Sequence, residues 1–408
     1  MKKGTMGIGW VLALFLMATK PVFAEEAKGL APGWLSLDGS VGLIDKQIDE
    51  ATAALGKALF GINITGYLDT SWTYSTNHRG SFWNHNITGR YFDQDQNQVV
   101  FNDFNLTLDK PEKDWGVGFH VVGDFGRTGQ LLRQATQWRD NFGGPATSAE
   151  LREAYATYTV PIGAGLQIKG GKFVTLMGTE ILPAPGSYNP NISRSFVFNL
   201  GEPLTHTGVL FSYPVAKMLT VMGGPVTGWD DPHDNNNRPS FHGGFTFTPA
   251  DAFSLTTSIM NGPEQSHQNG RDRFGISSVA TIKPMALLTL FLEHMYGHEE
   301  KVTPSLRNAT WQGVAAIASY DWTDRFNTAL RGEVFKDSDG ARTALNQDVR
   351  LSEITLTAAY KFTAKLLGRA ELRNDFSNRD VFAIGNSGRT DQHQTTIALQ
   401  LIYGFGGF

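Results

Sequence analysis

Charged side chains at alternate positions form the most regular polar pattern in the sequence. Arg369, Glu371, Arg373 and Asp375 alternate with the apolar or small residues of 366–372. Alternate side chains of a β-strand lie on one face, so these four charges predict a wall that meets water or polar partners. Such a wall hydrates and orients ions and dipoles without making or breaking a bond. The sequence has no G-x-S-x-G turn, phosphate-binding loop or HExxH motif, and so predicts no enzyme.

In the other alternating segments, the residues on the polar face of each predicted strand extend this wall. Acidic residues slightly outnumber basic ones along it, which predicts a weak cation preference for a water-filled channel. A hydrated wall held together by salt bridges is the simpler interpretation, and the sequence leaves both open. The candidate lining residues are Asp69, Asp103, Asn105, His120, Asp124, Glu153, Lys169, Glu293, Arg331, Glu333, Glu353, Arg369, Glu371, Arg373 and Asp375.

The alternating segments are about ten residues long, and short and long connections join them in turn. In 62–74, for example, Leu68 and Trp72 fall on the face opposite Asp69. Seven short and eight long joints predict sixteen strands. This order is typical of a transmembrane antiparallel β-barrel with periplasmic turns and outer loops, whereas a soluble sandwich gives no reason for it. The predicted fold class is all-β, a barrel of about sixteen strands that leaves an aqueous lumen, preceded by a short N-terminal amphipathic helix.

Composition removes several other classes of protein. The 408 residues include no cysteine, which excludes disulfides, thiolate metal sites and a lipid-anchored cysteine. A formal net charge of -4 argues against a nucleic-acid partner. Beyond the N-terminal segment, the longest strongly apolar run is 285–292, which is too short for a membrane-spanning helix.

The N-terminal residues 1–24 have the order of a secretory signal peptide, with two lysines, an apolar stretch over 8–18 and small residues before a cleavage point. An uncleaved membrane anchor is the alternative. We expect 1–24 to be a signal peptide, 25–60 an N-terminal periplasmic or luminal helical segment, and 61–408 the outer-membrane β-barrel of a Gram-negative bacterium.

An amphipathic helix is predicted within the second of these segments. Ile44, Ile48, Leu55 and Leu59 recur at helical spacing, with charged residues elsewhere on the wheel. The sequence leaves open whether this helix lies in the lumen, pairs with other subunits, rests on the membrane or is a linker.

The chain ends in TTIALQLIYGFGGF, whose apolar residues alternate as far as Phe405. A closed barrel pairs its last strand with its first, so that no strand edge faces lipid. We therefore expect 395–405 to be an integral strand, with an ordinary buried C-terminal strand as the alternative. Phe408 is out of phase with this apolar face, which leaves open the aromatic residue that the assembly machinery reads.

The connection 175–205 is the longest and is unusually apolar, particularly over 193–200. Solvated outer loops are rarely so apolar. One interpretation is a constriction loop that folds into the barrel, with Arg194, Glu202 and His206 as its polar contacts. The other is a loop that packs on the rim or on a neighbouring subunit.

Two stretches contain possible metal ligands. The segment DDPHDNNN (230–237) supplies oxygen ligands and a histidine, which suits a calcium ion or a cation that bridges lipopolysaccharide. Asp and Asn are also common at loop tips for turn reasons. The stretch EHMYGHEE (293–300) is predicted to be a strand that runs into a loop. Neither stretch is assigned a metal, and no cofactor is expected.

Five stretches of the chain carry a family resemblance. They are GYLDTSWTY, FNLTLDKPEKDWGVGFHVVGDFG, EAYATYTVPIGAGLQIKGGKFVTLMGTEIL, SRSFVFNLGEPLTHTGVLFSYPV and GWDDPHDNNN. They resemble the OmpL-like β-barrel porin family, and the likeness runs from about residue 61 to the end. Its densest part is 153–237, where Lys-Phe, Ser-Arg-Ser, Thr-His-Thr-Gly and Gly-Trp-Asp follow the family's order.

The resemblance implies an outer-membrane porin whose solute is mostly unassigned in the family. We expect passive diffusion of small polar solutes or ions, contacts with outer-membrane lipid and lipopolysaccharide, and, by analogy with other porins, a homotrimer. Two alternatives remain at this point. One is a plugged outer-membrane barrel with an enzymatic, adhesive or structural role, and the other is a secreted soluble carbohydrate-binding β protein.

Overall fold

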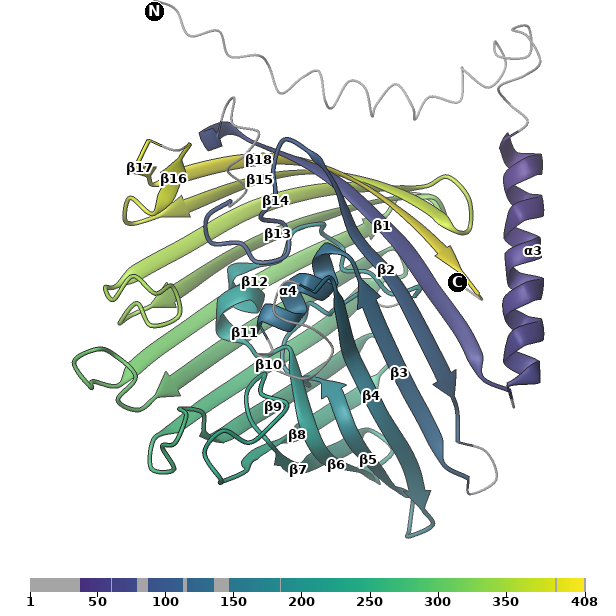
Figure 1. Cartoon of the computed structure of the whole chain (residues 1–408), viewed down its shortest axis with the longest axis horizontal. Coiled ribbons are helices and arrows are strands. Elements are labelled where there is room, and N and C mark those ends of the chain that lie inside the picture. Colours follow the sequence, from purple (N-terminus) through teal and green to yellow (C-terminus); the bar gives the residue numbers. More distant parts are fainter. Residues whose placement is uncertain are drawn as a thin grey trace, which may run out of the picture. The chain divides into compact units, whose positions relative to one another are not determined.

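A closed antiparallel barrel accounts for most of the chain in the computed structural model (Figure 1). The structure describes residues 37–59, 61–78, 87–112, 116–135, 147–183, 185–385 and 387–406. The predicted signal peptide and Phe408 lie outside these ranges. The chain divides into two units, Met1–Gln47 and Ile48–Phe408, and the barrel belongs to the second.

Sixteen strands form the ring, which confirms the predicted strand number. A separate two-stranded sheet joins β16 (Phe382–Ile384) to β17 (Arg389–Asp391). The barrel strands are β1 (Asn63–Ser75), β2 (Val99–Lys110), β3 (Gly118–Phe125), β4 (Ala149–Val160), β5 (Leu166–Val174), β6 (Thr205–Ala216), β7 (Leu219–Val226), β8 (Ser240–Ala250), β9 (Phe253–Pro263), β10 (Asp272–Met285), β11 (Leu288–Glu299), β12 (Ala309–Asp321), β13 (Phe326–Asp337), β14 (Val349–Lys361), β15 (Leu366–Ser377) and β18 (His393–Phe405).

The last strand closes the ring against the first. Ser71 of β1 pairs with Gln400 of β18, and Gly66 pairs with Phe405. The Phe405 ring lies where a Cβ on Gly66 would be, so the close approach of these two strands needs glycine at that position. This pairing confirms that the C-terminal segment is a barrel strand and not a frayed tail.

Apolar side chains cover the outward face of the wall. In β13, for example, Leu330 and Val334 are each 48% exposed, whereas Arg331 and Glu333 on the other parity are buried inside. Aromatic residues gather near the short turns, where the rings of Tyr320 and Trp322 lie 4.7 Å apart. An apolar belt with aromatic residues at its edge is the outer surface that a lipid bilayer requires.

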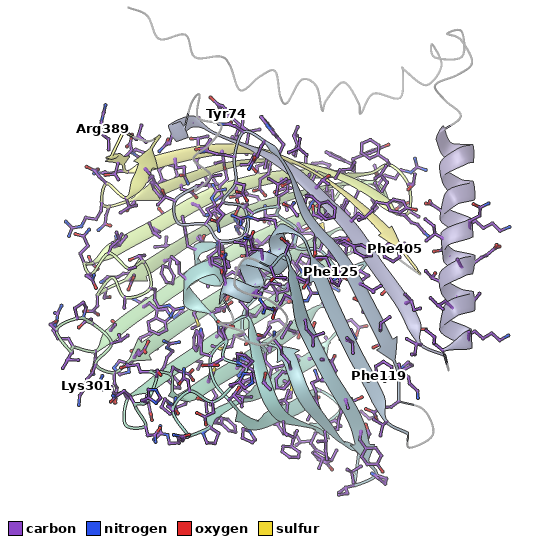
Figure 2. All side chains as sticks on the ribbon, viewed as in Figure 1. Tyr74, Phe119, Phe125, Lys301, Arg389 and Phe405 are labelled. Atoms are coloured by element: carbon purple, nitrogen blue, oxygen red, sulfur yellow. The ribbon has the colours of Figure 1, made fainter. Side chains whose placement is uncertain are left out.

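The space that the strands enclose holds an apolar cluster as well as polar side chains. Figure 2 shows side chains on both faces of the wall and on the segments inside it. The cluster combines inward residues of the strands with residues of the connection between β5 and β6, with Trp229 between β7 and β8 and with Phe382 of β16. Its aromatic and methionine members are Phe173, Met177, Phe196, Trp229, Met260, Met295, Trp311, Phe335 and Phe382.

Helices are few in the described residues. The predicted N-terminal helix is α3 (Leu37–Ala58), in which Leu55 is 52% exposed. The helix α4 (Arg127–Ala135) lies in the connection between β3 and β4, and a 3-10 turn covers Thr76–His78. None of the described helices is both long enough and apolar enough to span a bilayer.

Candidate functional site: a loop bound inside the barrel

The connection between β5 and β6, residues 175–204, lies inside the barrel and is called here the luminal loop. The hydroxyl of Tyr67 in β1 donates to the carbonyl oxygen of Pro183 at 3.2 Å, and Ser258 Oγ in β9 donates to the carbonyl oxygen of Leu176 at 3.1 Å. β1 and β9 are half a turn apart in the ring of strands. A loop that rested on the rim would not reach both, so of the two sequence interpretations the structure has the inward one.

A buried carboxylate holds the centre of the luminal loop. Glu333 accepts hydrogen bonds from the backbone N–H groups of Phe196, at 2.5 Å, and of Val197, at 3.0 Å. These amides begin the π-helical turn Val197–Gly201. Unpaired N–H groups at the start of a helical turn favour a negative charge. Glu333 therefore satisfies two backbone donors that would otherwise be buried without partners.

A second carboxylate, that of Glu371, binds an earlier part of the luminal loop. Glu371 accepts from the backbone N–H groups of Ile192, at 2.6 Å, and of Ser193, at 3.0 Å. Thr357 Oγ1 on the neighbouring strand donates to the same carboxylate at 2.8 Å, and Asn191 Nδ2 donates to Thr357 Oγ1 at 2.7 Å. The carboxylates of Glu333 and Glu371 thus both bind backbone N–H groups of the luminal loop.

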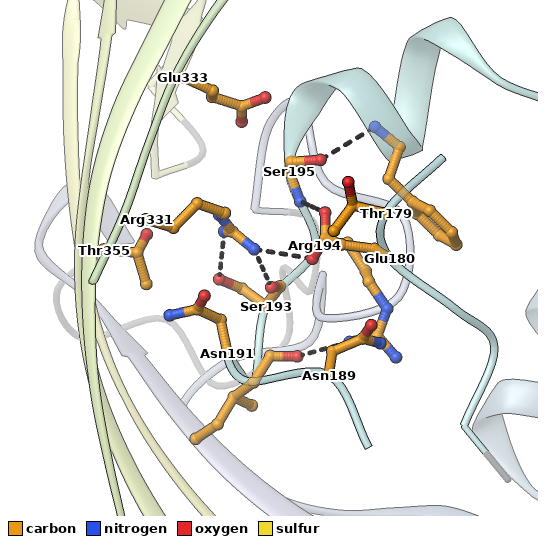
Figure 3. A network of polar contacts seen from close by, with 12 residues as sticks. Thr179, Glu180, Asn189, Asn191, Ser193, Arg194, Ser195, Arg331, Glu333 and Thr355 are labelled. Atoms are coloured by element: carbon orange, nitrogen blue, oxygen red, sulfur yellow. Dashed lines mark hydrogen bonds and ion pairs between the residues drawn. The ribbon is translucent and has the colours of Figure 1, made fainter. Parts of the chain in front are cut away.

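Arg331 is the centre of the polar network in Figure 3. Its guanidinium donates to Glu353 Oε1 at 2.7 Å, to Glu180 Oε1 at 2.8 Å and to the carbonyl oxygen of Ser193 at 2.6 Å. The side chain is 0% exposed. A buried charge is tolerated when it is paired and hydrogen-bonded, and here the partners include Glu180 and Ser193 from the luminal loop.

Two more guanidinium groups bind loop carbonyl oxygens. Arg373 Nη1 donates to the carbonyl oxygen of Arg194 at 2.5 Å, and Arg369 Nη1 donates to that of Asn189 at 2.6 Å. Arg373 also pairs with Asp375 at 2.6 Å. Of the charges that the sequence assigned to the wall of β13 and β15, all except Asp375 are therefore buried ligands of the luminal loop.

The acidic candidates of β1, β2 and β3 form a second polar group. Asp69, Asp103 and Asp124 are all buried and share a face with one another. Each carboxylate accepts a hydrogen bond from a neighbouring wall residue. The donors, in the same order, are Gln400 Nε2 at 2.8 Å, Tyr67 OH at 2.9 Å and Asn105 Nδ2 at 2.8 Å.

Lys169 and Glu153 lie on the adjoining wall of β4 and β5. Lys169 Nζ is 4.5 Å from the ring centre of Tyr155, a distance suited to a cation–π interaction. Glu153 accepts from the backbone N–H of Val174 at 3.4 Å. Lys169 therefore contacts the aromatic residues of its own wall, and Glu153 binds the last residue of β5, directly before the luminal loop.

His120 lines a cavity at the end of the barrel that carries the short turns. His120 Nδ1 lies 3.0 Å from Asp109 Oδ1. The cavity measures about 380 Å³ and lies on the inner face of β2 to β5. Its other polar lining residues are Lys110, Glu112, Tyr155, Thr157, Thr159 and Gln167.

Arg194 and Glu202, two of the three candidates for constriction, are buried. Arg194 Nη1 donates to the carbonyl oxygen of Ile192 at 3.1 Å, and its guanidinium lies 5.8 Å from the ring centre of Phe198. The Glu202 carboxylate occupies the space beside Gly178, where φ is +88° and a Cβ would overlap the carboxylate. Both side chains thus shape the loop and do not project into open solvent.

His206, the third candidate, lies at the start of β6 and helps to anchor the loop. Its ring nitrogens lie 3.0 Å from the carbonyl oxygen of Gly228 and 3.1 Å from Thr175 Oγ1. The ring of His242 lies 4.3 Å away, and His242 Nε2 accepts from the backbone N–H of Leu176 at 3.1 Å. This pair of imidazoles fixes the first residues of the luminal loop.

Residues 87–98 and the helix α4, which belong to two other connections, also lie within the barrel, and sequence reasoning missed them. Tyr91 OH donates to the carbonyl oxygen of Leu131 in α4 at 2.6 Å, and Arg90 pairs with the inward Asp375 at 2.8 Å. The adjacent leucines at 131 and 132 were the one sequence signal of a packed helix. Both segments meet the luminal loop through a small apolar cluster, formed by Leu132, Leu182, Phe198 and Leu204 with Phe92 against it.

Two carboxyl groups in other loops accept hydrogen bonds from the end of the luminal loop and from the connection between β7 and β8. Asp230 accepts from the backbone N–H groups of Leu204, at 2.5 Å, and Thr205, at 2.9 Å, and burial raises the pKa of Asp230 to about 6. Glu264 accepts from the backbone N–H of Trp229 at 2.7 Å, and burial raises its pKa to about 7.

The other acidic residues of 230–237 bind their own loop. Asp231 accepts from Asn235 Nδ2 at 2.7 Å. Asp234 accepts from the backbone N–H groups of Asn236, at 2.9 Å, and Asn237, at 2.7 Å. These are turn-stabilising bonds of the kind that Asp forms at loop tips. Within the described ranges, three or more His, Asp or Glu side chains nowhere gather in a metal-binding arrangement.

A sixteen-stranded antiparallel barrel with an apolar outer belt and a long inward loop has the architecture of a bacterial outer-membrane porin. A family model described as "Putative beta-barrel porin-2, OmpL-like" matches residues 61–405. The chain belongs to this family, which confirms the resemblance drawn from the sequence.

Solved porin structures share the fold at low sequence identity. The anion-selective porin from Comamonas acidovorans is 12% identical, with a TM-score of 0.56 over 84% of this chain and 99% of that one. The outer membrane channel DcaP of Acinetobacter baumannii is 13% identical, with a TM-score of 0.55 over 84% of this chain and 97% of that one. The trimer form of OmpT from Vibrio cholerae is 10% identical, with a TM-score of 0.54 over 84% of this chain and 99% of that one.

No curated protein matches the sequence. The family and the structural neighbours identify the chain as a porin of the bacterial outer membrane. They do not support the soluble carbohydrate-binding alternative, and they point to a channel rather than an enzyme.

Proposed function

We propose that small polar solutes or ions diffuse passively through this porin, along the wall formed by β2 to β5 and without a chemical step. The observation that carries the proposal is the position of the luminal loop. Glu333, Glu371 and Arg373 bind it to the wall of β13 and β15, while the polar cavity of about 380 Å³ adjoins a different group of strands, β2 to β5.

The luminal loop is then the element that limits the width of the channel. Deletion of 185–200 should increase single-channel conductance in a planar bilayer, because it removes the backbone that Glu333, Glu371 and Arg373 hold inside the barrel. A control is a deletion in 304–308, an exposed stretch of the connection between β11 and β12. Unchanged conductance after the first deletion would refute the constriction.

A weak preference for cations is part of the proposal. The guanidinium groups of Arg331, Arg369 and Arg373 are buried and bound to the loop, and those of Arg331 and Arg373 also bind buried carboxylates, so they present little charge to a solute. Two acids, Asp109 and Glu112, line the cavity beside a single lysine, Lys110, and a local acidic excess favours cations.

The reversal potential in a KCl gradient tests this preference. The unmodified protein should give the sign of a cation-selective channel, and Asp109→Asn with Glu112→Gln should move the potential toward zero. Asp251→Asn with Asp324→Asn removes the same charge from exposed turn residues and should have a smaller effect. An anion-selective sign for the unmodified protein would contradict the preference.

The partners and the segments outside the barrel are also matters of proposal. We propose a homotrimer, supported by the trimeric relative, with outer-membrane lipid and lipopolysaccharide around it. We further propose that 1–24 is a cleaved signal peptide and that 25–60 is an N-terminal periplasmic or luminal segment. N-terminal sequencing of the exported protein and native mass spectrometry in detergent test these two points.

One observation favours a second candidate, a plugged barrel with a structural or adhesive role. The luminal loop, α4 and residues 87–98 together bury most of the charged wall. Protein that migrates as a folded barrel on an unheated gel yet gives no conductance steps would favour this candidate over diffusion.

A further inference from the structure

The outer face of β11 to β14 carries polar side chains near the end that bears the long loops. Lys336 of β13 is in register with Arg350 of β14 and with Gln312 of β12. His294 of β11 lies beside them, and these four side chains are called here the outer basic patch. They border a groove of about 330 Å³.

The outer basic patch faces away from the lumen. Val314 and Val334, which share its parity and line the same groove, are 55% and 48% exposed. On the opposite parity of β13, Arg331 and Glu333 bind the luminal loop. The patch is therefore on the surface that meets lipid in a porin barrel.

The depth of the patch follows from strand geometry. Lys336 lies eight residues along β13 from Thr328, which pairs with Tyr320 of the aromatic belt near the short turns. At about 3.3 Å per residue and a tilt of about 40°, eight residues span roughly 20 Å along the barrel axis. Because the apolar band is about 25 Å tall, the patch lies at its outer edge, where the headgroups of the outer leaflet begin.

The cations of the patch exceed the acids beside them. Lys336 is 3.8 Å from Asp348. Among the described residues, no carboxylate lies within ion-pair distance of Arg350, and its side chain is exposed. Exposed cations beside hydrocarbon are costly unless an anionic group meets them.

We propose that the outer basic patch binds the phosphate group of an anionic lipid of the outer leaflet. The Arg350 guanidinium can hold two phosphate oxygens at once, Lys336 adds a second positive charge, and Gln312 and His294 offer further polar contacts at the groove. Val314 and Val334 lie on the membrane side of the charges and pack against the acyl chains. The occupant is a phosphorylated lipid, because only an amphiphile matches a cationic edge directly above an apolar groove.

Native mass spectrometry of the refolded protein in detergent, with purified bisphosphorylated lipid A as the probe, tests the proposal. Lys336→Gln with Arg350→Gln should weaken binding about 25-fold, since each basic residue near an anionic membrane surface contributes about fivefold. The matched control, Arg325→Gln with Lys361→Gln, removes the same two charges from exposed positions at the short-turn end of the same strands and should leave binding unchanged. Heat-modifiable gel migration verifies that both variants fold.

Four binding results would overturn the assignment. They are equal binding by the patch variant and the unmodified protein, equal loss in the control, equal binding of dephosphorylated lipid A, and full displacement of lipid A by inorganic phosphate. The last would make the patch a site for free anions. A dimer or trimer that forms only while the patch is intact, without bound lipid A, would assign the surface to a second copy of the chain and would also refute the proposal.

Discussion

Arg331 shows how one side chain couples the wall to the luminal loop. Its three acceptors are Glu353 of the wall and Glu180 and Ser193 of the loop. These partners replace the water molecules that an exposed guanidinium would bind, and this allows Arg331 to lie fully buried.

Arg331→Gln should therefore destabilise the protein strongly. Removal of one member of a buried charge network leaves its partners uncompensated, at a cost of about 3–5 kcal/mol. Urea unfolding in lipid vesicles, followed by tryptophan fluorescence, measures the change. Arg325→Gln, in an exposed turn, is the control and should change the free energy of unfolding by less than about 0.5 kcal/mol. Similar values for both variants would mean that Arg331 is not a structural ligand.

Asp230 and Glu264 predict a pH dependence of the outer loops. Burial raises their pKa values from 3.8 to about 6 and from 4.5 to about 7. The folded loops therefore bind protons more tightly than the unfolded chain does, so their stability is greatest at acidic pH and declines as pH rises through 6 and then 7.

Amide hydrogen exchange of 227–239, measured at pH 5 and pH 8, tests this pH dependence of loop stability. The rates are corrected for the intrinsic pH dependence of exchange. Protection should be greater at pH 5. In Asp230→Asn with Glu264→Gln the difference should largely disappear, because neither side chain titrates. Greater protection at pH 8 in the unmodified protein would contradict the assigned direction.

At the scale of elements, the luminal loop depends on carboxylates from strands far along the chain. Glu333→Gln with Glu371→Gln places an amide N–H₂ beside backbone donors that need an acceptor, at a cost of about 1–3 kcal/mol for each buried group left unsatisfied. We expect faster proteolysis within 185–200 and larger conductance fluctuations, with normal barrel migration on gels. Asp324→Asn, an exposed acid in a short turn, should affect neither. Unchanged proteolysis in the double variant would show that other contacts hold the loop.

The elements of the wall could be predicted from the sequence because their signal is local. The alternation in 62–74 and 366–375 reports which parity meets lipid, and the lengths of the joints report which end carries the turns. Both follow from the geometry of a strand in a bilayer.

The contents of the lumen could not be predicted in the same way. A charged side chain has the same parity whether its partner is water or the backbone of a loop, so Arg369 and Glu371 looked like pore lining. The partners of Arg369 and Glu371 lie in 189–193, far away in sequence. The helix α4 was missed because a short amphipathic stretch within a long connection resembles an outer loop.

At the scale of the whole molecule, closure of the ring depends on close contact between β1 and β18. A Cβ on Gly66 would overlap the ring of Phe405 and the carbonyl oxygen of Asn105, whereas a Cβ on Gly332 would make only an ordinary contact, at 3.8 Å, with the carbonyl oxygen of Glu353. Gly66→Ala should cost about 1–3 kcal/mol through overpacking and reduce the heat-modifiable folded fraction. Gly332→Ala is the matched control and should fold normally. A normal folded fraction in Gly66→Ala would mean that the closing strands can shift to make room.

The pairing of β1 with β18 also determines the order in which the barrel can assemble. The first strand to be exported waits for the last, and pairings between such distant residues form slowly. Glu333 and Glu371, which bind the luminal loop, are themselves exported after it. Through that interval the chain has two unpaired strand edges and a loop without its ligands, which is the state most open to mispairing with other chains.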